Sequence, residues 1–138
     1  MKKLSQWVLP FLAPALLLVG CAAGSTAEQT PATYRQVSSA EAAEIMQEES
    51  DYFLLDARTQ EEYETGHIPG AVCIPNETIG DTEPEQLTDK EQLILVYCRT
   101  GRRSKEASQK LAEMGYSNVV EFGGIVDWTG ETVSGANP

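Results

Sequence analysis

The sequence predicts a single α/β domain with a mostly parallel five-stranded sheet flanked by helices. Three observations support this prediction. Short apolar runs alternate with helix-like segments in the order β-α-β-α-β-β-α-β, which is typical of a layered α/β sandwich. The run at residues 93–97 has five apolar residues in a row, as expected of a strand covered on both faces. The chain has 138 residues, enough for one domain whose core needs no disulfides.

The first half of the domain contains two helix-start signals. Residues 34–37 form a short strand candidate, and Ser38 with Glu41 then makes a capping box, in which each residue satisfies a backbone N–H of the first helical turn. Apolar residues follow at helical spacing. A second box, at Thr59 and Glu62, comes after a strand candidate at residues 52–55 and predicts a short helix.

The second half supplies the remaining elements. Residues 71–74 predict a strand, and the polar, acidic stretch 76–91 predicts a loop with one helical turn. After the apolar run at 93–97, residues 104–114 have one apolar helix face and end at Gly115, a residue typical of the position after a helix. Residues 119–122 predict the fifth strand.

The charge of the chain excludes one class of partner. The formal net charge is −11, whereas a nucleic-acid-binding protein needs clustered Lys and Arg to neutralise phosphates. Anionic lipid head groups would also repel an acidic surface. We therefore expect no nucleic-acid partner, and any membrane attachment requires a covalent or inserted anchor.

The N-terminus has the features of such an anchor. Lys2 and Lys3 precede an apolar run at residues 7–19, which is too short to span a membrane comfortably, since ~20 residues are needed. The following Leu-Val-Gly-Cys resembles the lipobox of bacterial lipoproteins. The resemblance implies a signal peptide at 1–20, a diacylated Cys21 and an exported protein, lipid-anchored to a bacterial membrane on its extracytoplasmic side. An ordinary signal peptide or an uncleaved anchor is the alternative.

These features divide the chain into four parts. Cleavage before Cys21 would remove two lysines and no acid, so the net charge would fall from −11 to −13. Residues 21–33 are small and polar and predict a flexible tether with a reach of roughly 20 Å. The domain should extend over residues 34–133, followed by a polar tail at 134–138.

Cys98 is the candidate reactive group. It directly follows the predicted strand 93–97, and carboxyl ends of parallel strands are where α/β proteins bind ligands. Gly101 permits a tight turn in which successive N–H groups point at one atom, and the next helix adds its positive end, so a thiolate would be stabilised there. Four of the eight basic residues left after cleavage lie within seven positions: Arg99, Arg102, Arg103 and Lys105.

Simpler explanations exist for each feature taken alone. A cysteine after an apolar strand is usually an inert buried thiol, and basic residues at a helix start are usually a solvated surface. However, cations at a helix N-terminus oppose the helix dipole unless an anion lies between them. The combination therefore indicates a site for small anions.

Three segments carry a resemblance to a known family. The sequence CRTGRRS at 98–104 resembles the active-site loop of single-domain rhodaneses, the thiosulfate sulfurtransferases. LDAR at 55–58 with EYETGHIPGA at 62–71 resembles the first signature of that family, and FGGIVDW at 122–128 resembles its last. The resemblance covers essentially the whole domain and implies a rhodanese-like three-layer sandwich.

The resemblance also implies a chemistry, with no cofactor and no metal. Cys98 would be the catalytic nucleophile, taking sulfur from thiosulfate or a similar donor as a persulfide and passing it to a thiol or to cyanide. Arg99 and Arg103 would hold the donor's oxygens, while Thr100, Arg102 and Ser104 would shape the rim. The substrate-binding set is Arg99, Thr100, Gly101, Arg102, Arg103 and Ser104.

Loop length separates the chain from related enzymes. Phosphatases and arsenate reductases related to this fold use Cys-x5-Arg, whereas Arg103 follows Cys98 at Cys-x4-Arg, a smaller ring that favours sulfur over phosphate. Mercaptopyruvate-specific relatives tend to carry Gly after the nucleophile, where this chain has Arg99. Thiosulfate-like donors are therefore expected.

Two other candidates are weaker. His67, the single histidine of the chain, lies in a turn of the first signature, and we expect a structural role, as we do for Asp56 and Arg58. Cys73 lies in the middle of a predicted strand and is expected to pack inside, although it could resolve a persulfide on Cys98 or form a disulfide with it. Two alternative functions stay open at this point: a noncatalytic or slow carrier or sensor of sulfane sulfur beside a membrane partner, and a thiol–disulfide partner that uses Cys73.

Overall fold

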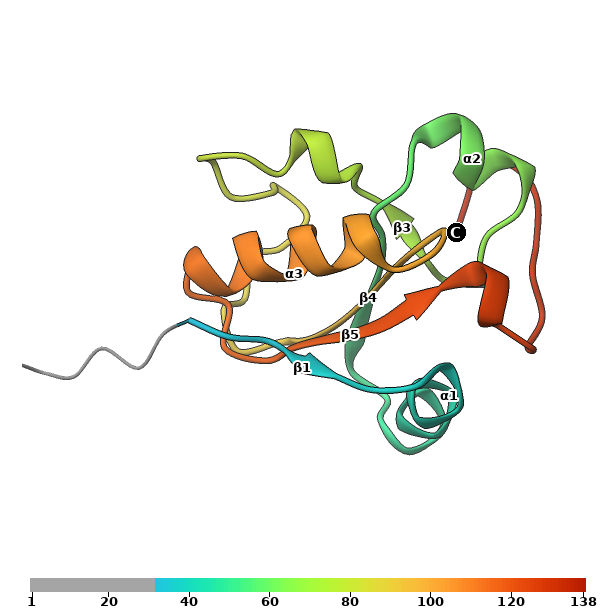
Figure 1. Ribbon diagram of the computed structural model, residues 1–138, viewed down its shortest axis with the longest axis horizontal. Helices are drawn as coiled ribbons and strands as arrows, with labels where there is room; N and C mark the ends of the chain where they lie inside the picture. The colour runs from blue at the N-terminus through green and yellow to red at the C-terminus, as the bar shows by residue number, and fades with distance from the viewer. Residues whose placement is uncertain (1–31) are drawn as a thin grey trace, which may run out of the picture.

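A computed structural model of the chain describes residues 32–138 and shows one sheet of five parallel strands, with the order β1-β5-β4-β2-β3 (Figure 1). The predicted α/β class and five-stranded sheet are confirmed, and every strand pair is parallel. The strands are β1 (Arg35–Gln36), β2 (Tyr52–Asp56), β3 (Val72–Cys73), β4 (Leu93–Cys98) and β5 (Val119–Gly124). The helices are α1 (Ser39–Glu48), α2 (Gln60–Thr65) and α3 (Arg102–Glu113), with short 3-10 turns at η1 (Asn76–Thr78) and η2 (Ile125–Asp127).

The central strand β4 divides the core into two layers. Ile94, Val96 and Cys98 pack with residues of α3 on one face of the sheet. Leu95 and Tyr97 pack on the other face, with residues of α1 and α2. Figure 1 shows α3 and α1 on opposite sides of the sheet. Because β4 is buried on both faces, its unbroken apolar sequence is explained.

Both predicted capping boxes are present. The Glu41 N–H donates to Ser38 Oγ (3.2 Å), and the Ser38 N–H donates to the Glu41 carboxylate (2.7 Å). The same exchange joins Thr59 and Glu62. By contrast, α3 begins at Arg102, two residues before the predicted start, and has no side-chain cap. The residue before the helix is Gly101, which has no side chain to serve as a cap.

The polar tail packs on the domain. Val133 and His67 form an antiparallel bridge, each N–H donating to the other's carbonyl at 2.8 Å. Further along, the Gly135 N–H donates to the carbonyl of Glu64, and the Asn137 carbonyl lies 3.0 Å from His67 Nε2. The tail therefore covers the end of α2 and ties down the turn after it.

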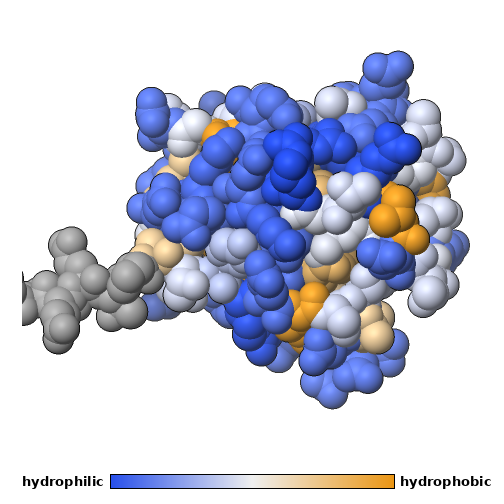
Figure 2. Space-filling view, viewed as in Figure 1, coloured by the Kyte–Doolittle hydropathy of each residue, from blue (hydrophilic) through white to orange (hydrophobic). Residues whose placement is uncertain are grey.

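The predicted signal peptide, Cys21 and nearly all of the tether lie outside the described residues. Among residues 32–138, no helix is both long and apolar enough to cross a membrane. Figure 2 shows a mostly hydrophilic face with small hydrophobic patches, and Val126 is a large apolar residue that lies exposed.

Candidate active site

Cys98 ends β4, and the turn that follows directs a backbone donor at its sulfur. The Gly101 N–H donates to Cys98 Sγ at 3.0 Å. Cys98 is only 1% exposed, so the sulfur lies at the bottom of the loop and not on its rim. α3 starts immediately after this turn and directs its N-terminal end at the same region. The turn therefore directs one backbone N–H, that of Gly101, at the sulfur, whereas we expected several successive N–H groups to converge on it.

Two glycines make this tight turn possible. Gly101 has φ +108°, a left-handed conformation that side chains disfavour, and it takes the position directly before α3. Gly124, at the end of β5, lies against the loop so closely that a Cβ atom there would be 2.1 Å from the Arg99 carbonyl oxygen. The Val126 N–H also donates to this carbonyl (3.3 Å). The end of β5 thus supports the loop from the side.

Beneath the loop lies a polar contact that the sequence analysis missed. Ser104 Oγ donates to the buried Glu121 carboxylate (Oε1, 2.6 Å), which also accepts the Gly123 N–H (2.8 Å). Ser104 is fully buried, which corrects our expectation that it shapes the rim. The available signal for Glu121 was one acidic residue inside the apolar strand Val-Val-Glu-Phe.

The loop's basic residues divide into paired and unpaired ones. Arg103 makes two hydrogen bonds to the Glu62 carboxylate, at 2.7 and 2.9 Å, and this contact lowers the pKa of Glu62 to about 2. Arg102 pairs with Glu106 at the surface. In the described part of the chain, Arg99 makes no ion pair.

This division changes the expected roles. The bond to Glu62 also raises the pKa of Arg103, and it uses two of the guanidinium's N–H donors. We expected Arg103 to hold the donor's oxygens together with Arg99. In the structure its side chain instead joins α3 to α2 through the ion pair with Glu62. Exposed groups at the loop remain to meet an anion: Arg99, Thr100 and Lys105.

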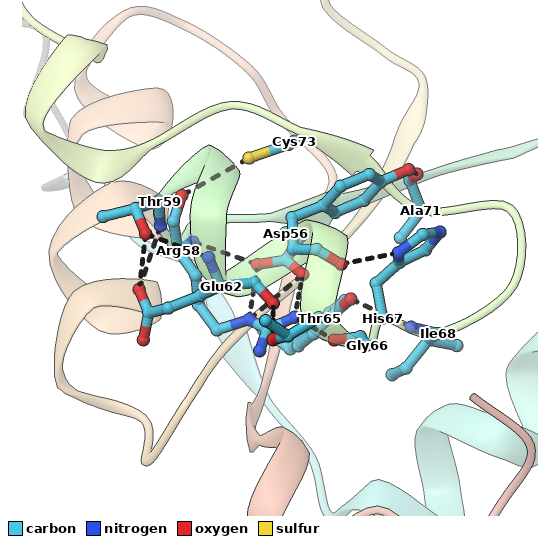
Figure 3. A network of polar contacts seen from close by, with 12 residues as sticks. Asp56, Arg58, Thr59, Glu62, Thr65, Gly66, His67, Ile68, Ala71 and Cys73 are labelled. Carbon is cyan, nitrogen blue, oxygen red and sulfur yellow. Dashed lines mark hydrogen bonds and ion pairs between the residues drawn. The ribbon is translucent and has the colours of Figure 1, made fainter. Parts of the chain in front are cut away.

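The loop after β2 contains a closed polar network (Figure 3). Arg58 Nη2 lies 2.7 Å from Asp56 Oδ2 and also donates to the Gly66 carbonyl (2.7 Å), and both side chains of the ion pair are buried. The pair joins the end of β2 to the end of α2. A structural role for Asp56 and Arg58, as predicted, agrees with these contacts.

His67 is buried and has no free ring nitrogen. Nδ1 lies 2.8 Å from the Tyr63 carbonyl and Nε2 lies 3.0 Å from the Asn137 carbonyl. The ring also stacks on Tyr63 with a centroid distance of 3.7 Å. Because carbonyl oxygens engage both nitrogens, His67 is not available as a base for Cys98, in agreement with the predicted structural role.

Cys73 belongs to the other face of the sheet. It packs with the α1 and α2 layer, whereas Cys98 packs with α3. Strand β2 lies between their strands, so their Cα atoms are on the order of 10 Å apart, too far for a disulfide. This geometry excludes the disulfide that we left open. Burial, and secondarily the Asp56 carboxylate, raise the pKa of Cys73 to about 11.

No metal site appears in the part of the chain that the structure describes. Residues 32–138 contain no group of three or more His, Cys, Asp or Glu side chains placed to hold an ion.

Comparisons with known proteins identify the family of this domain. Residues 38–131 match the model of the rhodanese-like domain. The chain is 37% identical to the thiosulfate sulfurtransferase PspE of Escherichia coli K12 over 73 residues, covering 53% of this chain and 70% of that protein. A solved rhodanese with anions from E. coli is 34% identical, with a TM-score of 0.56, and covers 61% of this chain and 99% of its own.

A second solved structure gives the same result with a broader overlap. A rhodanese-like domain protein from Staphylococcus aureus is 28% identical, has a TM-score of 0.60, and covers 70% of this chain and 93% of its own. The matched family model includes β2, the Cys98 loop and β5, which are the elements that build the site. The chain therefore belongs to the rhodanese-like domain family.

Proposed function

We propose that the protein is a sulfurtransferase that carries sulfane sulfur on Cys98. The Cys98 thiolate attacks the outer sulfur of thiosulfate, the S–S bond of the donor breaks, and sulfite leaves with the electron pair. An acceptor thiolate or cyanide then attacks the outer sulfur of the persulfide and regenerates the Cys98 thiolate. The Gly101 N–H at 3.0 Å from Sγ carries this proposal, because it stabilises negative charge on the sulfur.

The charges at the loop favour a small anionic donor. Arg99 and Lys105 are exposed and unpaired among the described residues, in a protein of net charge −11, so the loop concentrates anions locally. Cys98 is almost inaccessible from outside, which favours a donor that presents one small sulfur atom. The name of the relative PspE and the anions in the E. coli rhodanese support thiosulfate or a similar donor.

Mass spectrometry of the intact protein tests the first half of the cycle. Thiosulfate should add one sulfur atom to the wild type and to Cys73→Ala, release one sulfite per chain, and leave Cys98→Ser unmodified. Cys73→Ala is the matched control, since it removes the other thiol of the domain. An unmodified wild type after thiosulfate, polysulfide and mercaptopyruvate would contradict the proposal.

The second half of the cycle separates an enzyme from a carrier. Repeated turnover with cyanide or a small thiol, lost in Cys98→Ser, supports the transferase. Loading without release to either acceptor would instead favour the noncatalytic carrier or sensor. Hydrolysis of para-nitrophenyl phosphate that depends on Cys98 would overturn the argument from loop length.

We also propose that the domain is exported and lipid-anchored through Cys21. The sequence pattern at 18–21 supports this proposal. Fractionation of cells should place the wild type with membranes and Cys21→Ala in the soluble fraction, and a clickable fatty-acid analogue should label only the wild type. Equal labelling of both proteins would contradict it.

A further inference from the structure

The buried carboxylate of Glu121 lies directly below the reactive loop. Glu121 is 2% exposed and belongs to β5, on the sheet face that carries Cys98 and α3. Its oxygen Oε1 accepts two hydrogen bonds, one from Ser104 Oγ and one from the Gly123 N–H. Burying a carboxyl group costs free energy that an apolar residue in the same strand would not. An apolar side chain at position 121 would have been sufficient for packing alone.

The same hydroxyl group also contacts Gly101, the residue whose N–H faces the sulfur. Ser104 Oγ also lies 3.0 Å from the Gly101 carbonyl oxygen and 3.3 Å from that of Gly123. Gly101 itself is close to β5, because a Cβ atom there would be 3.6 Å from the Gly123 Cα and 4.0 Å from Glu121 Oε1. A single hydroxyl group therefore joins the first turn of α3, the Gly101 residue and the end of β5.

We propose that Glu121 is a positioning residue that acts through Ser104 and Gly123 to hold the Gly101 amide on the Cys98 sulfur. Gly101 has a left-handed backbone that glycine can easily leave, so its N–H direction depends on external contacts. The Glu121 carboxylate fixes Ser104 and Gly123, which flank Gly101. The ionisation of Cys98 then depends on a side chain that does not touch the sulfur. The catalytic meaning of this positioning rests on the proposed function, but the positioning itself does not.

The chain offers a matched control on the same helix. Ser108 is one turn after Ser104 in α3 and is equally buried, yet its hydroxyl has no hydrogen-bond partner among the described residues. Ser104→Ala and Ser108→Ala therefore make the same chemical change in the same environment. Only the first breaks the contact with Glu121.

The pH dependence of Cys98 alkylation by iodoacetamide, followed by peptide mass spectrometry, tests the proposal. Ser104→Ala should move the midpoint of the alkylation profile upward by about one pH unit, since an amide no longer stabilises the thiolate. Ser108→Ala should leave it in place. Glu121→Gln should not raise it, because its carboxamide oxygen can accept the same two hydrogen bonds. Glu121→Ala removes the same charge as Glu121→Gln but also loses this acceptor, so its midpoint should lie about one pH unit above that of Glu121→Gln.

Two outcomes would overturn the proposal. One is equal profiles for Ser104→Ala and Ser108→Ala, and this pair decides the matter even if Glu121→Ala fails to fold. The other is a Glu121→Gln protein that behaves like Glu121→Ala. Because alkylation needs no sulfur donor, a wild type that never forms a persulfide would contradict the proposed function and leave this result intact.

Discussion

Cys73 ends β3 and Cys98 ends β4 at the same carboxyl end of the sheet, and the groups that face their two sulfurs are opposite in kind. Cys98 Sγ receives a backbone N–H, whereas the Cys73 thiol donates to the carbonyl oxygen of Arg58 (3.4 Å; Figure 3). A backbone N–H can stabilise negative charge that forms on a sulfur, whereas a carbonyl oxygen accepts a hydrogen bond only from a protonated thiol. Cys73 is the more exposed of the two. We therefore expect the reactivity of each cysteine to depend on the backbone groups that face its sulfur more than on the exposure of its side chain.

The largest expected difference between the two cysteines is in their alkylation rates at pH 7. With a pKa of about 11, Cys73 has only about one thiolate in ten thousand molecules at this pH. We expect limiting iodoacetamide to modify Cys98 at least a hundredfold faster than Cys73, as measured by peptide mass spectrometry. In concentrated urea the two rates should become similar, because both environments are lost. Faster modification of Cys73 in the native protein would refute the comparison.

A smaller but still large effect is expected from Gly124→Ala. The added methyl group would overlap the Arg99 carbonyl oxygen, so the loop must move and the Gly101 amide must leave the sulfur. We expect sulfur transfer to fall more than tenfold and the free energy of unfolding to fall by about 1–3 kcal/mol. Steady-state kinetics and urea unfolding measure the two effects.

Gly80→Ala is the control for this change. Gly80 has open space around its Cα and lies in a loop on another part of the surface. The same methyl group there should leave both transfer and stability unchanged. If Gly124→Ala also leaves transfer unchanged, the loop is not held by β5 in the way described.

The smallest expected effect concerns the ion pair that joins the two regions. Burial and the Asp56 carboxylate raise the pKa of Cys73, with a smaller contribution from the Glu62 carboxylate, whose partner Arg103 lies on the loop of Cys98. The pKa of Glu62 in the folded protein is lowered to about 2. Its contribution to the free energy of unfolding is therefore present above the ordinary pKa of 4.5 and is lost as the pH falls towards 2. We expect Glu62→Gln to destabilise the domain by about 1–2 kcal/mol at pH 7, and less at pH 3.

Urea unfolding at both pH values measures this change. Glu83→Gln is its counterpart, because it breaks only the exposed pair with Lys90 and should have no measurable effect. A Glu62→Gln difference that stays constant from pH 7 to pH 3 would show that the carboxylate charge does not contribute.

Local sequence signals predicted much of this structure. The two capping boxes and the strand before Cys98 depend on residues close together in the chain, and all three are present. The resemblance located the reactive loop. Contacts between distant segments were missed: Ser104 meets Glu121 and Arg103 meets Glu62 across 17 and 41 positions. Spacing along one element carries no information about such partners, so Ser104 and Arg103 received roles that their contacts do not support.

The parallel sheet places the N-terminal entry of the chain and Cys98 at opposite ends of the domain. β1 runs parallel to β5, so the chain enters at the edge opposite to the one where β4 delivers Cys98. Figure 1 shows the segment before β1 at the far end from the loop, near which the C-terminus lies. If Cys21 holds the lipid, as proposed, the lipid would be attached at the end of the domain opposite to the sulfur. A soluble small molecule or a diffusing protein could then reach it without approaching the bilayer.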